Sequence, residues 1–392
     1  MTAGMRTRPL GQLAPDRLWA RTPASGQVTG FRFAAPPSGS RPPPTHQVTI
    51  GGSNDERCVG SPEAGPGGSR GHGGPPRGGA GRGLVLPGAR TACPVSRVTV
   101  VVATRNRRGE LLRTLGMLTR LPERPPVIVV DNGSADGSAE AAAQSFPGVE
   151  IVALARNAGT AARNAGVRRA QTPYVAFSDD DSWWEPGALA TAVAVFDADP
   201  RLGLIAARTL VGPGCQPDPV NAAMARSALR ENGAAEVLGF LACACVVRKA
   251  AFLSIGGFSE LLFFVGEERL LAYDLAAAGW GRRYSPEVVA IHHPSGRRPD
   301  PGRRRRAELR NAVLTAWLRR PPAVALAESV SLASHAARDR DARGALADAA
   351  RRLPQALAGR RRLPCGVERK IRALAEAEQA KAGPARPAGR TS

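Results

Sequence analysis

Short apolar runs alternate with amphipathic segments in the middle of this chain. Runs rich in β-branched residues, which predict buried strands, lie at 97–103, 127–130, 149–153 and 174–177. Segments with apolar residues at helical spacing lie at 111–121, 139–146 and 160–170. Strands that are apolar throughout and alternate with helices predict a mostly parallel sheet flanked by helices on both faces. Ligands of such sheets bind beyond the carboxyl ends of the strands, so polar residues that directly follow a strand are candidate site residues.

The pattern becomes less regular after residue 186. Further elements are predicted as a helix at 189–196, strands at 202–207, 239–248 and 287–293, and a helix at 267–278. The segment 212–236 is predicted to be rich in loops. The longest apolar run, 238–247, is much shorter than the ~20 residues that cross a bilayer, and it predicts a core strand.

Composition divides the chain into four parts. In the first part, 1–95, 17 of the 29 residues from 60 to 88 are Gly or Pro, which predicts a disordered tail rich in Gly, Pro and Arg. An initiation codon assigned too far upstream would explain this tail equally well. The second part, 96–296, is the predicted α/β domain. The third, 297–380, is rich in Arg, Ala and Leu and predicts a helical basic extension, and the fourth, 381–392, predicts a disordered end.

The charge of the chain is strongly positive. Lys and Arg number 54 against 33 Asp and Glu, a formal net charge of +21, and only three of the 54 are lysines. Such a balance fits nucleic acid, an anionic membrane or phosphorylated substrates. The Arg-Gly tail lacks interleaved aromatic residues that stack on bases, so we expect no specific nucleic-acid partner. The arginine clusters at 297–298, 303–306, 319–320 and 360–362 predict either a solvated face or peripheral contact with an anionic membrane.

Two absences bear on location. The six cysteines form no CxxC pair and no zinc-ligand spacing, and the N-terminal segment lacks the apolar core of a signal peptide. We therefore expect a reducing, cytoplasmic location, with the basic extension at the inner face of the cell membrane.

The clearest chemical signal is three consecutive acids, Asp179, Asp180 and Asp181, at the end of a predicted strand. Desolvating adjacent carboxylates costs several kcal/mol each, and a cation relieves that cost. Carboxylate oxygens suit Mg²⁺, which typically binds one or two carboxylates together with substrate phosphates. An acidic turn that caps a helix near Trp183 is the alternative interpretation.

Four further groups follow predicted strands or begin helices. Asp131 follows a buried strand, either as a ligand-binding carboxylate or as part of a tight Asx turn. Arg163 lies in a loop and helix start that would suit a diphosphate. Glu267 and Glu268 begin a helix, where acids either balance the helix dipole or act as a general base. The neighbours His292 and His293 end a late strand and face opposite sides, so at most one of them reaches a metal.

In order and spacing, these blocks resemble the family 2 glycosyltransferases with the GT-A fold, over about 98–296. The resemblance rests on six stretches, namely Val100–Arg107, Val129–Ser134, Asn157–Gly166, Asp179–Asp181, Gly256–Phe258 and Gly266–Glu268. The triple Asp looks like the DxD metal motif of that family. The resemblance implies a nucleotide-sugar donor and a divalent metal, Mn²⁺ or Mg²⁺. It also implies a glycan or lipid-linked acceptor, and inverting transfer of a hexosyl or deoxyhexosyl group in cell-envelope polysaccharide biosynthesis.

The resemblance also implies a role for each motif residue. Asp131 would contact the base, Arg163 the diphosphate and Asp180 the ribose and sugar. The residues implied to bind the nucleotide sugar are Thr104, Arg105, Asn106, Asp131, Asn157, Arg163, Asp179 and Asp180. Those implied at the metal are Asp181 and one of His292 and His293, and those on the acceptor side are Gly257, Phe258 and Glu260. Many relatives have Glu-Asp where this chain has Glu267-Glu268; Glu268 takes the position of the catalytic base, and Glu267 remains a second candidate.

Two other classes of protein compete with this hypothesis. A nucleotidyltransferase also uses strand-end acids and a metal, but it usually has a Gly-rich basic signature after its first strand, which 103–107 does not provide. A non-catalytic, basic nucleic-acid-binding protein would explain the net charge, but it would leave the clustered acids unexplained.

Overall fold

The computed structural model describes residues 96–296 and 300–382. The disordered tail predicted for 1–95 lies outside the described residues. So does nearly all of the end predicted for 381–392, of which only the first two residues are described.

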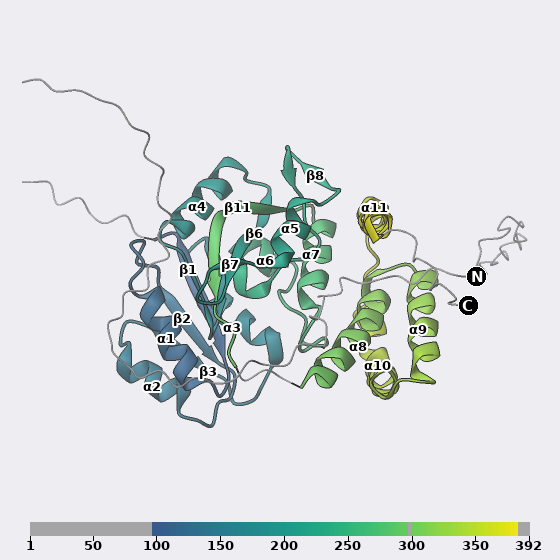
Figure 1. Cartoon of the computed structure of the whole chain (residues 1–392), viewed down its shortest axis with the longest axis horizontal. Helices are drawn as coiled ribbons and strands as arrows, with labels where there is room; N and C mark the ends of the chain where they lie inside the picture. The colour runs from purple at the N-terminus through teal and green to yellow at the C-terminus, as the bar shows by residue number, and fades with distance from the viewer. Residues whose placement is uncertain (1–95, 297–299, 383–392) are drawn as a thin grey trace, which may run out of the picture. The chain divides into compact units, whose positions relative to one another are not determined.

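A nine-stranded mixed sheet forms the centre of the α/β domain (Figure 1). Its strands are β1 (Val98–Thr104), β2 (Val127–Asp131), β3 (Glu150–Ala153), β4 (Tyr174–Asp179), β5 (Ser182–Trp184), β6 (Leu202–Val211), β7 (Gln216–Pro217), β10 (Cys245–Arg248) and β11 (Gly281–His292). The order is β3-β2-β1-β4-β10-β6-β11-β5, with β7 on β6. Strands β10, β5 and β7 run against the other strands, so the predicted mostly parallel sheet is confirmed. Strands β8 (Arg230–Glu231) and β9 (Ala234–Ala235) form a separate hairpin.

Helices cover both faces of the sheet. One face packs against α1 (Arg108–Leu118), α2 (Ser138–Ser145) and α4 (Ala188–Ala198). The other packs against α3 (Arg163–Arg169), α5 (Pro219–Ala225), α6 (Lys249–Ser254) and α7 (Glu267–Ala277). Successive strand residues point to opposite faces, so Val100 and Val102 lie in the first core and Val101 in the second. This explains why neighbouring positions within these strands are apolar instead of alternating with polar residues.

Two predicted elements differ from the structure. The strand expected at 239–248 is confined to β10, because a 3-10 turn (Ala242–Ala244) precedes it. The segment around Trp183, interpreted from sequence as a possible helix start, is strand β5, which pairs antiparallel with β11. Both segments are short and buried, and the spacing of apolar residues does not distinguish a buried turn from a buried strand at that length.

The C-terminal extension is helical, in α8 (Pro301–Arg319), α9 (Pro322–Ala336), α10 (Arg340–Ala358) and α11 (Cys365–Ala382). Helices α8, α9 and α10 lie side by side (Figure 1) and share a small core of Val313, Leu332 and alanines. A second cluster joins Leu314 and Leu318 of α8 to Leu262 and Leu270 of the α/β domain. In the described ranges, no helix combines the length and the apolar character that crossing a membrane requires.

Candidate functional site

Strand pairing brings the predicted site residues to one edge of the sheet. Thr104 at the end of β1 lies opposite Asp131 at the end of β2, and Ala103 lies opposite Asp179 at the end of β4. Because these three strands are parallel, their carboxyl ends meet. The loops that follow them therefore carry the polar residues that the sequence singled out.

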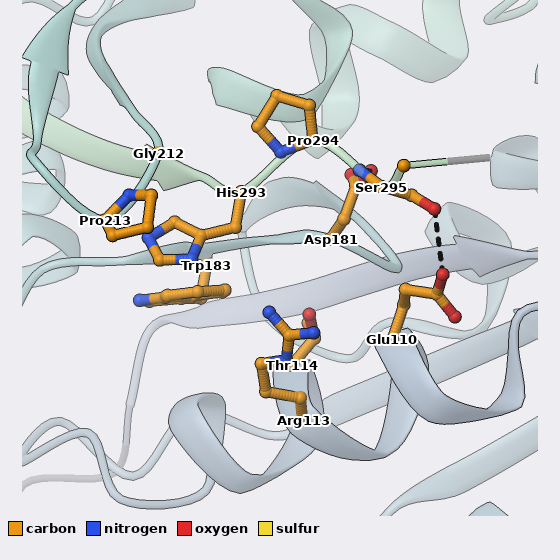
Figure 2. Close-up of a pocket in the computed structure, with 11 residues that line it drawn as sticks. Glu110, Arg113, Thr114, Asp181, Trp183, Gly212, Pro213, His293, Pro294 and Ser295 are labelled. Atoms are coloured by element: carbon orange, nitrogen blue, oxygen red, sulfur yellow. Dashed lines mark hydrogen bonds between the residues drawn. The ribbon is translucent and has the colours of Figure 1, made fainter. Parts of the chain in front are cut away.

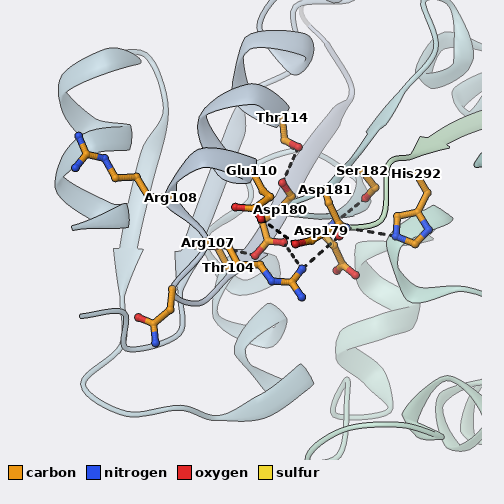
Figure 3. A network of polar contacts seen from close by, with 12 residues as sticks. Thr104, Arg107, Arg108, Glu110, Thr114, Asp179, Asp180, Asp181, Ser182 and His292 are labelled. Atoms are coloured by element: carbon orange, nitrogen blue, oxygen red, sulfur yellow. Dashed lines mark hydrogen bonds and ion pairs between the residues drawn. The ribbon is translucent and has the colours of Figure 1, made fainter. Parts of the chain in front are cut away.

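Asp180 lies at the centre of a buried polar network (Figure 3). Its carboxylate accepts hydrogen bonds from Thr104 Oγ1 at 3.0 Å and from Arg107 Nη1 at 3.0 Å. Its backbone carbonyl accepts one from Thr114 Oγ1 of α1 at 2.8 Å. Burial, together with the neighbouring acids, raises the pKa of Asp180 to about 7 despite the opposing effect of Arg107. The site therefore strongly favours a cation near this carboxylate.

Asp181 is held by three other groups. His292 Nε2 lies 3.4 Å from Oδ1, the backbone N–H of Ser295 donates to Oδ2 at 3.0 Å, and Arg107 Nη1 lies 3.3 Å from Oδ2. Burial by itself raises the pKa of Asp181, but the hydrogen bonds with His292 and Ser295 outweigh it and the net pKa is lowered. Asp181 is therefore a stable anion within the site.

The two histidines separate as strand geometry requires. Burial lowers the pKa of His292, but the hydrogen bond and charge of Asp181 outweigh burial and raise it. His293 packs its ring on Trp183 with centroids 4.7 Å apart, and its backbone N–H donates to the Asp181 carbonyl. Of the pair, His292 is the one whose ring contacts the carboxylate of Asp181.

Asp179 pairs with Arg163, whose side chain is buried. Burial lowers the pKa of Arg163, but the charges of Asp179 and Glu267 and the hydrogen bond to Asp179 act against burial, and the net pKa is raised. The next residue of α3, Asn164, accepts from the N–H of Phe258 and donates to its carbonyl, both at 2.9 Å. Phe258 itself packs among Phe177 and Phe252 in the core.

The loops after β1 and β2 are tied to each other. Asn106, with a backbone φ of +54°, accepts a hydrogen bond from Ala135 N, and its own N–H donates to Ser134 Oγ. Asp131 accepts from the N–H and the hydroxyl of Ser134, three residues further along the same loop, while Arg105 is exposed. Two of the residues implied to bind the donor, Asn106 and Asp131, therefore also build the loops that carry them.

The two candidate bases begin α7 near the same charges. Glu267 is buried, and its Oε2 has no hydrogen-bond partner among the residues that the structure describes, whereas Glu268 is half-buried. Burial raises the pKa of Glu267 to about 8, and it raises the pKa of Glu268 as well. The charges of Arg163 and Asp179 act on both carboxyls. The structure thus brings the start of α7 close to the acid cluster, and Glu268 is the more accessible of the two.

The donor set around Asp181 fits a divalent cation. The carboxylate of Asp181 suits both Mn²⁺ and Mg²⁺, whereas the imidazole nitrogen of His292 suits the transition metal Mn²⁺ better than the harder Mg²⁺, which prefers oxygen ligands. In the described part of the chain, no three His, Cys, Asp or Glu side chains gather as a complete metal site. Two protein ligands leave coordination positions for phosphate oxygens, which is the usual arrangement for Mg²⁺ at a nucleotide.

A cavity of about 230 Å³ opens beside Asp181 (Figure 2). Its lining residues are Glu110, Arg113, Thr114, Asp181, Trp183, Gly212, Pro213, His293, Pro294, Ser295 and Gly296. Glu110 of α1 accepts a hydrogen bond from Ser295 Oγ at 2.8 Å across its mouth. The volume is below the ~300–1,000 Å³ of pockets that enclose drug-sized ligands, so this cavity does not hold a whole nucleotide sugar by itself.

Three residues at the site were not identified as candidates from sequence. Arg107 contacts both Asp180 and Asp181, Thr114 holds the Asp180 backbone, and Asn164 holds Phe258. Arg107 ends the stretch Val100–Arg107, one of those on which the family resemblance rests. It follows Thr104, Arg105 and Asn106, which the resemblance implied as nucleotide-sugar ligands. Its neighbour Asn106 has a left-handed backbone, and the direction in which such a turn sends the next side chain is not visible in the residue pattern.

Residues 99–256 match the model of glycosyl transferase family 2. The protein is a glycosyltransferase, and the part of it that matches family 2 is the portion of the α/β domain from residue 99 to residue 256. This enzyme class takes the place of the two alternatives, a nucleotidyltransferase and a non-catalytic nucleic-acid-binding protein.

Similar proteins include two glycosyltransferases of Mycobacterium tuberculosis. The N-acetylglucosaminyl-diphospho-decaprenol L-rhamnosyltransferase is 27% identical over 283 residues, covering 60% of this chain and 91% of the relative. The pre-mycofactocin glycosyltransferase is 31% identical over 208 residues, covering 50% of this chain and 42% of the relative. Among solved structures, the mannosyltransferase PcManGT from Pyrobaculum calidifontis aligns with a TM-score of 0.45 and 21% identity, over 73% of this chain and 79% of that one.

Proposed function

We propose that this glycosyltransferase moves a sugar from a nucleoside-diphosphate sugar to a hydroxyl of a lipid-linked glycan, with inversion at the anomeric carbon. The observation that carries the proposal is the convergence of Asp180, Asp181, Arg163 and the start of α7 at one edge of the sheet. The proposed acceptor class is taken from the rhamnosyltransferase of Mycobacterium tuberculosis, of which the match covers 91%. By its name, that relative acts on N-acetylglucosaminyl-diphospho-decaprenol.

The donor side of the proposal uses the loops after β1, β2 and β4. Thr104, Arg105 and Asn106 line the nucleotide pocket, and Asp131 contacts the base at the floor of that pocket. Asn157 lies in the loop before α3, where its Oδ1 accepts from Gly159 N at 2.9 Å and shapes the turn. Arg163 and Asp179 form an ion pair that orients the guanidinium toward the diphosphate.

Asp181 and His292 would hold the divalent cation. When bound, that ion neutralises the negative charge that develops on the departing nucleoside diphosphate. Asp180 keeps Arg107 beside the same place through its hydrogen bond, and it contacts the ribose and the sugar. We assign His292 rather than His293 to the metal, because the His292 ring contacts the Asp181 carboxylate and the His293 ring packs on Trp183.

Glu268 acts as the general base. Its carboxylate takes the proton of the acceptor hydroxyl, and that oxygen forms the new bond to the anomeric carbon. The bond from the anomeric carbon to the β-phosphate breaks, and the nucleoside diphosphate leaves with the electron pair. Gly257 and Glu260 belong to the acceptor side, whereas Phe258, whose ring is buried, supports them from the core.

Product analysis tests the proposed reaction. Incubation of the full chain with Mn²⁺, a set of nucleotide sugars and a polyprenyl-diphosphate-linked acceptor is expected to release a nucleoside diphosphate in equal amount to the glycosylated lipid. Release of pyrophosphate, or turnover that is unaffected by a metal chelator, would contradict the proposal. The same set of donors, screened for metal-dependent thermal stabilisation, identifies the sugar and the nucleotide.

We also propose that the extension meets an anionic membrane through α9, which suits a lipid-linked acceptor at the inner face of a cell membrane. The exposed residues between Pro322 and Ala337 are Pro322, Ala323, Leu326, Ala327, Val330, Ser331, Ala333, Ser334, His335 and Ala337, none of them acidic, Lys or Arg. Leu326 and Val330 are 58% and 60% exposed one turn apart. Exposed arginines follow at 338, 340 and 343, and an apolar face beside cations fits an anionic lipid surface.

Replacing both Leu326 and Val330 by Glu is expected to lower binding to phosphatidylglycerol vesicles at least about tenfold, because burying one such side chain contributes ~1.5–3 kcal/mol. Co-flotation at low salt measures the binding, with phosphatidylcholine vesicles as the neutral comparison. Leu357→Glu is the matched control, since Leu357 is an exposed leucine of α10 outside this face. A wild-type protein that stays unbound, or a light-scattering measurement showing that α9 joins two copies, would contradict this proposal.

A further inference from the structure

Helix α8 of the extension reaches into the α/β domain at the loop that precedes α7. Asn311 is 1% exposed, and its side-chain nitrogen lies 2.9, 2.8 and 2.6 Å from the carbonyl oxygens of Leu262, Phe264 and Val265. An amide nitrogen has two hydrogens, so three acceptors share them. All of these acceptors lie within six residues of Glu268.

Neighbouring side chains fix the direction of this amide. Arg310 Nε donates to Asn311 Oδ1 at 2.8 Å, which sets the oxygen on one side and turns the nitrogen toward the loop. Arg310 Nη2 also donates to the Leu262 carbonyl at 2.8 Å, and Arg352 of α10 donates to the Leu261 carbonyl at 2.9 Å. Two helices of the extension therefore hold one loop by its backbone.

The loop needs such support because its backbone is strained. Phe263 and Val265 have φ of +65° and +70°, a region that L-residues rarely adopt and that a β-branched residue such as Val avoids most strongly. Phe263 and Phe264 are 36% and 39% exposed, so their packing supports the loop only in part, beside that of the buried Leu262. Strain of this kind persists only where surrounding contacts determine the conformation.

The opposite side of the loop contacts the donor side of the site. Thr160 donates to the Phe263 carbonyl from both its N–H and its hydroxyl, each at 2.8 Å. At Gly159 a Cβ would lie 2.0 Å from that same oxygen, so only glycine permits the approach. Asn132, directly after β2, in turn holds the Gly159 carbonyl at 3.0 Å.

We infer that Asn311 is a positioning residue for the catalytic carboxylate: α8 holds the loop 261–265 in the strained form that sets the start of α7 against the donor site. The extension is on this view a working part of the active site. The inference rests on the proposed role of Glu268. Because α7 begins directly after the loop, a small shift of the loop moves both Glu267 and Glu268.

The test compares Asn311→Ala with Arg306→Ala in the full chain. Arg306 stands on the same helix and pairs with Asp348 of α10, so its loss weakens the extension without touching the loop. Asn311→Ala is expected to lower kcat between about tenfold and a hundredfold, as small misplacements of catalytic groups do, with the KM for the donor unchanged. Arg306→Ala is expected to keep kcat. Hydrogen–deuterium exchange is expected to rise at 261–266 in the first variant alone.

Each outcome decides between the alternatives. Equal losses of kcat in the two variants would mean that the extension acts only through overall stability, and this would overturn the inference. Faster exchange of the loop with unchanged kcat would show that Asn311 holds the loop but does not position Glu267 and Glu268. This result would also overturn the inference. Retained turnover in Glu268→Gln would instead contradict the proposed base. The exchange measurement would still show whether Asn311 holds the loop 261–266, because it does not depend on the reaction.

Discussion

Asp181→Asn is expected to slow sugar transfer by about a thousandfold while the protein remains folded. Asparagine keeps the size of the side chain and an oxygen that accepts from the Ser295 N–H, so the local hydrogen bonding persists. It loses the negative charge that faces His292 and Arg107. Removing one preorganised electrostatic contact at a site of developing charge typically costs about a hundredfold to a thousandfold in rate.

Two measurements check this expectation. Initial rates at saturating donor give the loss of turnover, and calorimetric titration with Mn²⁺ in the presence of nucleoside diphosphate gives the loss of metal affinity. Asp341→Asn, which alters a carboxylate in the first turn of α10, is the control and is expected to keep both. A variant at 181 that retains most of the wild-type rate and metal affinity would move the metal site elsewhere.

Glu268→Gln is expected to reduce turnover between about a hundredfold and ten-thousandfold, the range that general-base catalysis contributes. The neutral amide has nearly the same shape, so binding of the nucleoside diphosphate is expected to stay unchanged. Rate measurements under single-turnover conditions and calorimetric titration of the nucleotide separate the two effects. Full turnover in this variant, with loss in Glu267→Gln, would identify Glu267 as the base.

The pH profile provides a second check on the same residue. A general base works in its deprotonated form, and burial raises the pKa of Glu268 above the ordinary 4.5 of a glutamic acid. The wild-type rate is therefore expected to increase with pH through a range above 4.5. The charge of Glu268 also raises the pKa of Glu267. The observed rise of the rate with pH therefore reports the titration of both carboxyls together. In Glu268→Gln the pH dependence of the residual rate is expected to change, because Glu268 no longer contributes to this rise.

Much of the α/β domain follows from the residue pattern. The strands β1, β2, β3 and β4 are continuous apolar runs, and a run that is apolar on both faces is stable only inside a sheet covered on both sides. Polar residues that end such runs must then gather at one edge, because parallel strands share a direction. This reasoning reached Asp131 and the acids at 179–181 without coordinates, whereas Thr104 was implied by the family resemblance.

Other parts of the site form where segments far apart in the sequence come into contact. The pattern of apolar and polar residues does not predict which segments do so. Strand β5 and the turn before β10 are too short for apolar spacing to identify, since three or four buried residues satisfy either structure. Arg107 contacts Asp180 across 73 positions of sequence, and Asn164 contacts Phe258 across 94. Local propensity describes neighbours along the chain, whereas these contacts arise from the way in which the sheet closes.

The sequence by itself determines that this protein has acids at strand ends, a buried sheet and two adjacent glutamates at the start of a helix. Each of these features is a local property of residue type and spacing. Tertiary structure decided which histidine meets Asp181 and how deeply each glutamate is buried. It also decided that Asn311 holds a loop 46 to 49 positions away. Contacts of that kind depend on the packing of whole elements, whose free energy is shared among many side chains and is not recorded in any one motif.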